Sequence, residues 1–497
     1  MAEHLAEAPP STAYVFNHIE VTRSNLKEVY SHIIRKVSGA SHIAIDFEFT
    51  GLGKKSSVNN IHHHYLAIKQ AVEQHSIVSF GLSIARENDL TASSADKSSL
   101  HNANIDNSNS RGLQYEFDNF NFLTLIQGPI LFSKGTGTWL AASGFDFNKF
   151  FLEGIPFQPP LIKKEEEKEL NSSSSKSDDK SKVMLSKLLN TIVDLMKYKK
   201  IPLVLHNGLH DIMYLYYSFI GPLPDTFPEF LTKIATAFPS GIYDTKFMAY
   251  TNTFNATFLS YLFAKCDRLR IDAYKDPQAE IATKDNQSNK NNKTYFDIQV
   301  NDTIIDTTFD KVVEIGSKRK SIHFEIETER TTIKKRSTSI EENTTTTKDN
   351  SLNTNRQKKI KVCRDYAMKG YCSHPNHTNY CEEHDIQLVL NSEMGPSNYP
   401  TYYTCNLNDG RSAHSAYFDA YMTAFIYCYL KHTLSLKAMD SAKNRIRIDF
   451  APEYIQIPTL PAEDPSSKPH QQTASSQVPS LSSQISTYSS QTVSSQE

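Results

Sequence analysis

Residues 42–53 read HIAIDFEFTGLG and contain the most informative pattern in the chain. The apolar residues predict a buried strand, yet Asp46 and Glu48 stand inside it. Because side chains alternate along a strand, acids two positions apart project from the same face. Two neighbouring buried carboxylates are costly, so the pair predicts a compensating cation.

Two further acids lie among apolar residues. The stretch IPLVLHNGLHDIMYLYYSF predicts a buried strand, a turn at Asn207 and Gly208, and a helix that carries Asp211. The stretch AYFDAYMTAFIYCYL, residues 416–430, predicts a core helix that carries Asp419. Asp211 alone could equally be a solvated helix residue. The ordered set of four acids is far more specific than any one of them.

If these acids converge on one face, four carboxylates surround one position. Two divalent ions about 3.5–4 Å apart would neutralise them, and such a pair is suited to phosphodiester cleavage. Magnesium is the expected metal because it takes hard oxygen ligands. His414, five positions before Asp419, is expected on the loop before that helix. Its neutral imidazole near pH 7 suits a general base for the attacking water.

Length and composition set the broad class. The chain has 497 residues, a length that allows two or three domains. Its formal net charge of −2 is close to neutral, so no global basic field indicates nucleic-acid binding. The N-terminus lacks the pattern of a secretory signal, and no apolar run approaches the roughly 18 residues of a membrane span. We therefore expect a soluble nuclear or cytosolic protein that does not contact membranes.

Polar segments divide the sequence. An α/β domain is expected over 15–270, interrupted by polar insertions at 88–111 and 163–183, and completed by 395–455. A disordered polar linker is expected over 271–360 and a disordered Ser/Gln-rich tail over 462–497. Basic runs near 318–320, 334–336 and 358–361 could serve nuclear import or RNA contact, or could simply be solvated.

A dense cysteine and histidine cluster occupies the segment 361–388. Three of the six cysteines, Cys363, Cys372 and Cys381, fall close together, which points toward a metal in an intracellular protein. The alternative is a loop with incidental cysteines. Tyr366, Tyr371 and Tyr380 could stack on unpaired bases or pack a very small core.

The sequence resembles the DEDD-type exonucleases of the histidine subclass, and more closely the poly(A)-specific ribonuclease and Caf-type deadenylase family. The resemblance rests on the acids and on HHYLAIK, SIVSFGL, FNKFFLEGIPF, VLHNGLHDIMYLY and FPSGIYDTKFMAY. It implies an α/β fold with a ribonuclease-H-like mixed sheet flanked by helices and an inserted CCCH zinc finger. It is strongest for the zinc-finger branch of the family, which trims small nuclear RNAs.

The resemblance also implies roles for individual residues. Asp46, Glu48, Asp211 and Asp419 would bind two Mg²⁺ ions, and His414 would be the general base. Asp244, with His206 and Asn207, would lie behind the ligands or beside the substrate; for Asp244 the alternative is a surface acid at a strand end. Cys363, Cys372, Cys381 and His384 would bind Zn²⁺, although His374 or His377 could replace one ligand, because eight residues separate Cys372 from Cys381.

The implied activity is removal of nucleotides from an RNA 3′ end, with release of 5′-nucleoside monophosphates. The implied substrate is single-stranded RNA, in particular oligo(A)-tailed or extended small nuclear RNA in the nucleus, including Cajal bodies and the nucleolus, with a cytoplasmic fraction left open. Self-association also stays open. Two alternatives remain: a DNA 3′-exonuclease, and an RNA-binding protein with an inactive nuclease fold.

Overall fold

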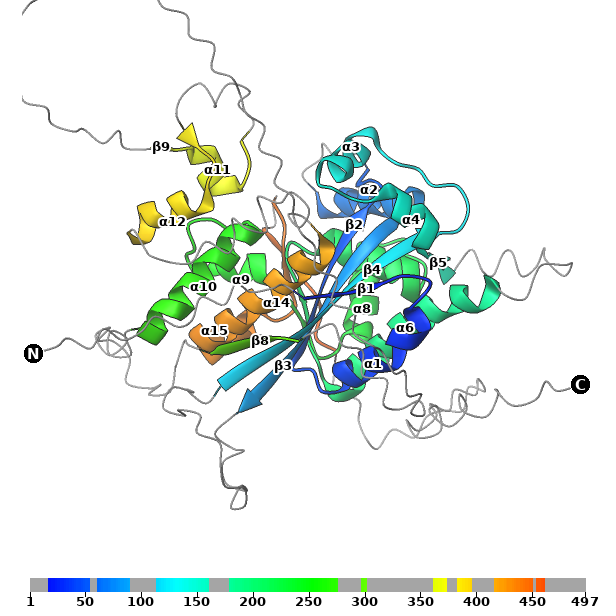
Figure 1. Ribbon diagram of the computed structural model, residues 1–497, viewed down its shortest axis with the longest axis horizontal. Helices are drawn as coiled ribbons and strands as arrows, with labels where there is room; N and C mark the ends of the chain where they lie inside the picture. Colours follow the sequence, from blue (N-terminus) through cyan, green and yellow to red (C-terminus); the bar gives the residue numbers. More distant parts are fainter. Residues whose placement is uncertain are drawn as a thin grey trace, which may run out of the picture. The chain divides into compact units, whose positions relative to one another are not determined.

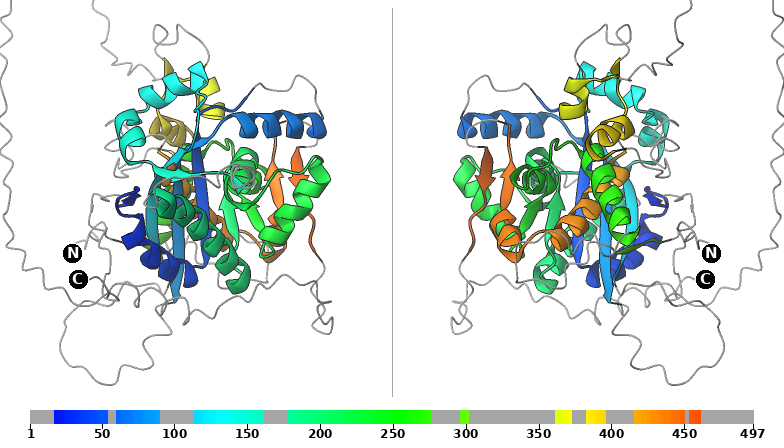
Figure 2. Two further views of the ribbon diagram at one scale, coloured as in Figure 1. Left: turned by 90° about the vertical axis from the view of Figure 1, so that its right-hand side faces the viewer. Right: turned by 90° about the vertical axis from the view of Figure 1, so that its left-hand side faces the viewer.

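The structure is a computed structural model, viewed in Figures 1 and 2. It describes the residues 17–53, 60–89, 113–160, 178–275, 296–301, 361–372, 382–395, 415–449 and 453–460. All of its elements belong to one compact unit, Met1–Thr459.

Strands and helices alternate along most of the chain. The strands are β1 (Ile19–Val21), β2 (His42–Phe49), β3 (Ile77–Asp89), β4 (Leu113–Ile126), β5 (Ile155–Phe157), β6 (Leu203–Leu205), β7 (Ile242–Asp244), β8 (Asp297–Val300), β9 (Lys361–Val362), β10 (Glu382–Glu383), β11 (Arg445–Arg447) and β12 (Tyr454–Gln456). The longer helices are α1 (Leu26–Ser38), α2 (Ile61–Gln74), α6 (Asp178–Lys199), α8 (Phe227–Ala237), α10 (Leu259–Lys275) and α14 (Ala416–Thr433). The shorter ones are α3 (Lys134–Ala142), α4 (Phe147–Glu153), α7 (Leu209–Leu215), η2 (Tyr216–Ile220), α9 (Thr245–Thr251), α11 (Arg364–Lys369), α12 (Ile386–Met394) and α15 (Leu436–Ala442).

One mixed sheet organises the molecule, in the order β1-β4-β3-β2-β6-β7-β11-β12. β3 runs antiparallel to both β2 and β4, whereas β2, β6, β7 and β11 are parallel to one another. The long antiparallel strands on one side and the short parallel strands on the other form the expected ribonuclease-H-like mixed sheet. Because the four parallel strands point the same way, their carboxyl ends share one edge, where open α/β sheets place their sites.

Helices cover both faces of the sheet (Figures 1 and 2). Residues of α1, α6 and α8 pack with Ile43, Ile45 and Phe47 of β2 in one core cluster. Residues of α10, α14 and α15 pack with Ala44 and Val204 in the other. Since side chains alternate along β2, Asp46 and Glu48 lie on the α14 face, the face of Ala44. The expected α/β fold with a mixed sheet flanked by helices is therefore confirmed.

Two expected polar segments contain regular structure. β8 lies within the expected linker 271–360, pairs in parallel with β4, and follows the fully buried Phe296. Its short apolar alternation was masked by the surrounding polar residues. α6 begins at Asp178, inside the expected insertion 163–183, because its polar first turn leads into an amphipathic helix. α10 likewise extends to Lys275, past the expected boundary at 270.

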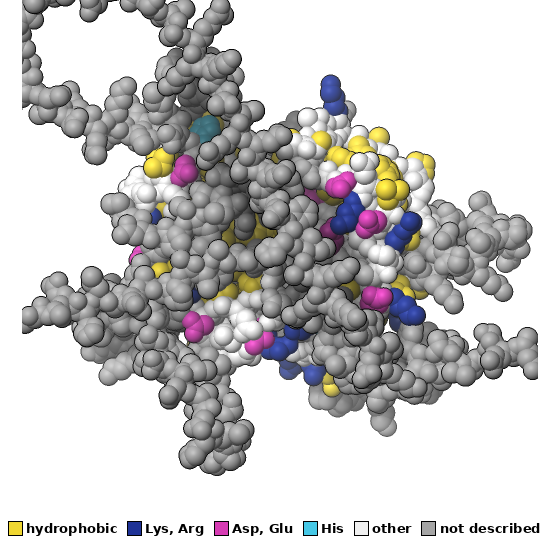
Figure 3. Space-filling model, in the orientation of Figure 1, with side chains coloured by type: hydrophobic (Ala, Val, Ile, Leu, Met, Phe, Trp, Pro, Cys, Tyr) yellow, Lys and Arg dark blue, Asp and Glu magenta, His cyan; other side chains and the backbone are white. Residues whose placement is uncertain are grey.

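Exposed apolar side chains gather over α3 and α4 (Figure 3). Leu131, Trp139, Phe151 and Leu152 are between 41% and 66% exposed. Beneath them, Leu140 and Phe150 belong to a small separate core. Contiguous apolar surfaces of this kind are typical of interaction sites. None of the described helices combines the length and apolar character needed to cross a bilayer.

Candidate active site

Three of the four acids meet at the carboxyl edge of the sheet. Carboxylate oxygens of Asp46, Glu48 and Asp419 all lie within 4.8 Å of one another. Asp46 and Glu48 come from β2, and Asp419 comes from the first turn of α14, which crosses β2 and β3. Residues more than 370 positions apart in the sequence thus form one cluster.

Asp211, on α7, lies beside this cluster and is held there by a hydrogen bond from the backbone of β2. β6 pairs with β2 only at Ile43 and Ala44 and ends at Leu205, so none of the described strands pairs with the farther part of β2 on that side. The backbone N–H of Phe47, on this open side, donates a hydrogen bond to the Asp211 carboxylate. The early end of β6 therefore makes room for an acid beside the other three.

Burial and mutual repulsion disfavour the charged forms of these acids. Burial raises the pKa of Asp46 well above its ordinary value, and Asp419, Asp211 and Glu48 raise it further. The pKa of Glu48 is raised for the same reasons, by burial and then by Asp419 and Asp211. Burial raises the pKa of Asp211 and of Asp419 to about 7, even though hydrogen bonds to Asp211 oppose the shift.

No basic side chain in the described part of the chain balances this charge. Among the residues that the structure describes, no Lys or Arg forms an ion pair with any of the four acids. A cluster of hard oxygen ligands with raised pKa values, and with no ion-paired Lys or Arg among the residues that can be placed, fits a divalent metal, which would restore the ionised forms. The donor set therefore agrees with the expected Mg²⁺ site.

A glycine brings α14 down onto the sheet. Gly81 of β3 pairs directly with Asp46 of β2. Its missing side chain admits the backbone of Ala416 and Tyr417, at the start of α14. From the N-terminal side, His18 stacks on Tyr417 with ring centroids 3.7 Å apart and an interplanar angle of 15°. These contacts hold the turn that carries Asp419.

Asp244 lies behind the cluster and is fully buried. One of its oxygens accepts hydrogen bonds from the backbone N–H groups of Asn207 at 3.1 Å and Lys246 at 2.8 Å. The other accepts from Gly208 at 3.4 Å and Arg447 at 3.2 Å. Asp244 therefore ties the turn before α7 to the start of α9 and to β11. It is not the surface acid of the alternative interpretation.

His206 and Asn207 shape the same turn. Asn207 is exposed and adopts a left-handed conformation, with φ of 57°. His206 Nδ1 lies 2.9 Å from Thr245 Oγ1, and the ring also hydrogen bonds to the backbone of Thr257. Burial, with a smaller contribution from Lys246, lowers the pKa of His206 to about 3, so the ring is neutral at physiological pH. These contacts place α7, and with it Asp211.

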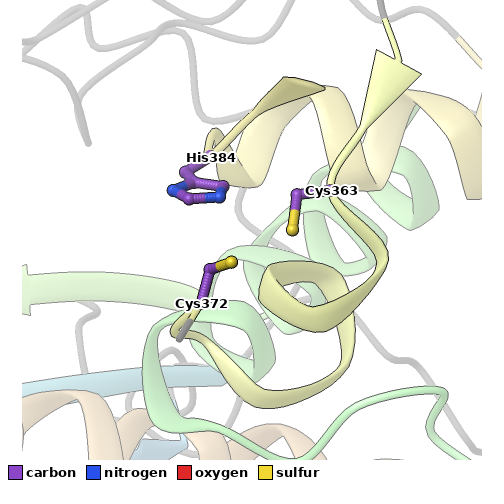
Figure 4. A group of neighbouring side chains, drawn as sticks. All are labelled: Cys363, Cys372 and His384. Carbon is purple, nitrogen blue, oxygen red and sulfur yellow. The ribbon is translucent and has the colours of Figure 1, made fainter. Parts of the chain in front are cut away.

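The cysteine and histidine cluster is also assembled, within the described residues 361–372 and 382–395, which we call the Cys/His module. Ligand atoms of Cys363, Cys372 and His384 all lie within 4.8 Å of one another (Figure 4). Cys363 and Cys372 flank α11, and His384 precedes α12. Tyr366 stacks on His384 with ring centroids 5.0 Å apart, so its ring packs inside the module, whereas Tyr371 is 65% exposed.

Several predicted residues lie outside the described part of the chain. These are His414, Cys381, His374, His377 and Tyr380, together with the basic runs at 318–320 and 334–336 and most of the run at 358–361. Their predicted roles stay predictions.

Sequence reasoning missed Gly81 and His18; a glycine inside the strand stretch IVSFGLSIA was a usable signal, because it often marks a close backbone approach.

The chain belongs to the CAF1 family of ribonucleases. The family's model matches residues 21–186 and 161–427, which include all four acids and the Cys/His cluster. The expected family resemblance is therefore confirmed.

Individual relatives match shorter segments. The pre-piRNA 3′-exonuclease trimmer of Bombyx mori is 37% identical over 67 residues, 14% of this chain and 12% of that protein. The poly(A)-specific ribonuclease PARN of Xenopus laevis is 25% identical over 151 residues, 28% of this chain and 21% of that protein. The matched parts thus span about an eighth and a fifth of these relatives.

Two solved structures are also similar. The RNase domain of the yeast Pop2 protein has a TM-score of 0.33 and 16% identity, covering 52% of this chain and 77% of that one. S. pombe Pop2p in its Mg²⁺- and Mn²⁺-bound form has a TM-score of 0.34 and 16% identity, covering 50% and 81%.

Proposed function

We propose that the protein is a metal-dependent 3′-to-5′ exoribonuclease that releases 5′-nucleoside monophosphates. The observation that carries the proposal is the convergence of Asp46, Glu48 and Asp419, with Asp211 beside them and no ion-paired Lys or Arg among the described residues. Membership of a ribonuclease family favours RNA over DNA as the polymer. The names of the matched relatives, a 3′-exonuclease and a poly(A)-specific ribonuclease, support the direction of attack.

The four acids would hold two Mg²⁺ ions. When bound, such ions activate the attacking water and stabilise the charge on the departing 3′ oxygen. The chain's own contribution is positional: β2 presents two carboxylates from one face, the Phe47 amide orients Asp211, and Gly81 admits the turn that carries Asp419. The structure supports this ligand set through the chemistry of its donors.

His414 is proposed as the general base. It would take a proton from the water that attacks the terminal phosphorus, and the bond from phosphorus to the 3′ oxygen of the preceding nucleotide would break. The departing 3′ oxygen would take a proton from solvent water, so the products are a 5′-monophosphate and an RNA shortened by one nucleotide with a free 3′ hydroxyl. His414 precedes Ser415, whose carbonyl accepts the Asp419 backbone N–H at 3.0 Å, so it is adjacent in sequence to the catalytic turn.

The Cys/His module is proposed to bind one Zn²⁺. Cys363, Cys372 and His384 supply three ligands of the kind that structural zinc prefers, and Cys381 is the proposed fourth. The test is Co²⁺ substitution of the full chain. Thiolate-to-cobalt absorption is expected, and it should be lost in Cys363→Ser. Absence of this absorption band from the wild-type protein in the presence of Co²⁺ would refute the zinc site.

Small nuclear RNA with an oligo(A) or extended 3′ end is the proposed substrate, and the nucleus the proposed location. Both rest on the resemblance to the zinc-finger branch of the family. The exposed Tyr371 in the module is a candidate surface for stacking on an unpaired base.

The decisive experiment is a time course on a 5′-labelled RNA with an oligo(A) 3′ tail, in Mg²⁺ and in EDTA. Wild-type protein should produce a ladder that shortens from the 3′ end, and Asp46→Asn should not. Asp225→Asn is the control, because Asp225 is 97% exposed and pairs only with Lys69 in the described ion pairs. Intact RNA that stays bound to wild-type protein would favour the inactive, RNA-binding alternative. A DNA strand of the same sequence, degraded equally fast, would favour the DNA exonuclease.

A further inference from the structure

The Cys/His module lies directly against the loop that precedes α10, and that loop contacts the turn before α7. We propose that Phe258 joins the module to the catalytic edge, so that metal binding in the module stiffens the turn that positions Asp211. The proposal rests on the proposed zinc site but not on the proposed exonuclease activity. The Cys/His module, which is far from three of the four acids in sequence, would then be a fixed part of the structure that supports the active site.

On the module side, the ring of Phe258 packs directly against Gly370, where a side chain would collide with it. Gly370 ends α11 in a left-handed conformation, with φ of +79°, and a Cβ there would lie 2.7 Å from Cδ2 of Phe258. The ring of Phe258 also contacts Tyr366, with centroids 6.1 Å apart. Tyr366 in turn stacks on His384, a proposed ligand. One aromatic chain therefore leads from Phe258 to the metal site.

On the nuclease side, the neighbouring residue Thr257 accepts a hydrogen bond from His206 through its backbone. His206 directly precedes the left-handed Asn207 and Gly208, which begin α7. Phe258 and Thr257 thus connect the module and the catalytic turn through two consecutive residues. Neither connection depends on the segment between Cys372 and Glu382.

A second attachment prevents the module from pivoting about Phe258. Glu393 of α12 accepts hydrogen bonds from Tyr261 Oη at 2.8 Å and from Lys265 Nζ at 2.8 Å, both on α10. Arg268, one turn farther along α10, donates to Asn391 Oδ1 at 3.0 Å. Lys265 and Glu393 are 16% and 18% exposed, so this pair is shielded from solvent. Contacts at both ends of the module hold it in one orientation.

Mechanical coupling follows from this arrangement. Without metal, nothing covalent holds Cys363, Cys372 and His384 together, and α11 is only six residues long. So short a helix does not persist alone, because isolated helices below roughly 12 residues are marginal in water. Loosening of α11 would release Tyr366 and Gly370 from Phe258, and the Thr257 contact with His206 would be weakened next.

The test is hydrogen exchange on the full chain, in constant Mg²⁺, with the module loaded with Zn²⁺ or stripped by a zinc-selective chelator. Peptides over 203–211 and 252–262 should exchange at least about threefold faster after stripping, as local opening becomes easier. In Phe258→Ala, zinc should no longer protect 203–211, although Co²⁺ absorption still reports a bound module. Phe258→Leu, which keeps most of the bulk, should restore part of the protection.

Matched variants separate the coupling from general damage. Met368→Ala, on the same helix but 53% exposed, should retain full zinc-dependent protection. Gly370→Ala attacks the same contact from the other side and should give the same loss as Phe258→Ala. If the hydrogen-exchange rate at 203–211 in the wild type were the same with and without Zn²⁺, the coupling would be overturned. Protection that persists in both Phe258→Ala and Gly370→Ala would overturn the role of Phe258. A missing Co²⁺ signal in wild type would refute the zinc site, independently of nuclease activity.

Discussion

A Cβ on Gly81 would lie 2.0 Å from the carbonyl oxygen of Ala416 and 2.5 Å from Cα of Tyr417. Gly81 is also the cross-strand partner of Asp46. The same position therefore sets the depth at which α14 rests on the sheet and lies beside the first acid of the cluster. Since Asp419 is three residues beyond Ala416, the distance between the two acids depends on this contact.

Gly81→Ala is expected to lower kcat by about tenfold or more with little change in KM, because displacement of a catalytic group by about 1 Å can cost two orders of magnitude. Overpacking of this kind typically costs about 1–3 kcal/mol of stability. The measurement is steady-state kinetics on the tailed RNA, beside thermal melting. Gly135→Ala is the control, because a Cβ there meets nothing within 4 Å. Unchanged kcat in folded Gly81→Ala would contradict the assignment.

The stacking of His18 on Tyr417 should also hold the turn that carries Asp419, but its loss should have a smaller effect on kcat than Gly81→Ala. His18→Ala is expected to cost about 0.5–1.5 kcal/mol, the usual contribution of an aromatic pair, and to lower kcat several-fold. His18→Phe keeps a flat ring at 18 and should retain most of the activity. Kinetics of the two variants side by side check this. Equal losses in both would show that stacking is not the cause.

Without metal, stability should fall as pH rises from about 4 to 7. The pKa of Asp419 is 3.8 ordinarily and about 7 in the folded protein, so the folded state binds more protons than the unfolded state across this window. Stability is then greatest below the lower pKa and is lost as pH passes through the higher one. For one group, a shift of this size corresponds to roughly 4 kcal/mol.

Urea denaturation in EDTA at several pH values measures this dependence. Asp419→Asn should flatten the profile, and saturating Mg²⁺ should restore stability at pH 7 to 8 in the wild type. Asp225→Asn should leave the slope as it is. A metal-free protein equally stable at pH 5 and pH 7.5 would show that the acids are not destabilising one another.

Asp244→Asn should lower the free energy of unfolding several times more than a surface substitution such as Asp225→Asn does. The amide would place an NH₂ group where a carboxylate oxygen now accepts backbone N–H groups, and an unsatisfied buried donor costs about 1–3 kcal/mol. The turn at Asn207 and Gly208 would loosen, so both stability and kcat should fall. Chemical denaturation with Asp225→Asn as the reference tests this. A stability loss below that of the reference would argue against the buried hydrogen-bond role.

The strand with two acids, the turn at Asn207 and Gly208 and the helix of Asp419 could be predicted because each has a local signal. Alternation in β2 places Asp46 and Glu48 on one face, whatever lies opposite. β8 could not be predicted, since its four residues become a strand only by pairing with β4. The family resemblance implied a supporting place for Asp244, but its hydrogen-bond partners could not be predicted, because they come from three separate segments.

The sequence by itself determined which residues are candidates for the chemistry: four acids in apolar settings, and cysteines close enough along the chain to share a metal. Only the tertiary structure decided how those residues meet. The early end of β6 opens a place for Asp211, and the absent side chain of Gly81 lets α14 approach β2. Phe258 seats the Cys/His module against the loop that contacts His206. Each of these is a steric fit between segments distant in sequence, and such fits depend on the space left between packed elements rather than on any local pattern.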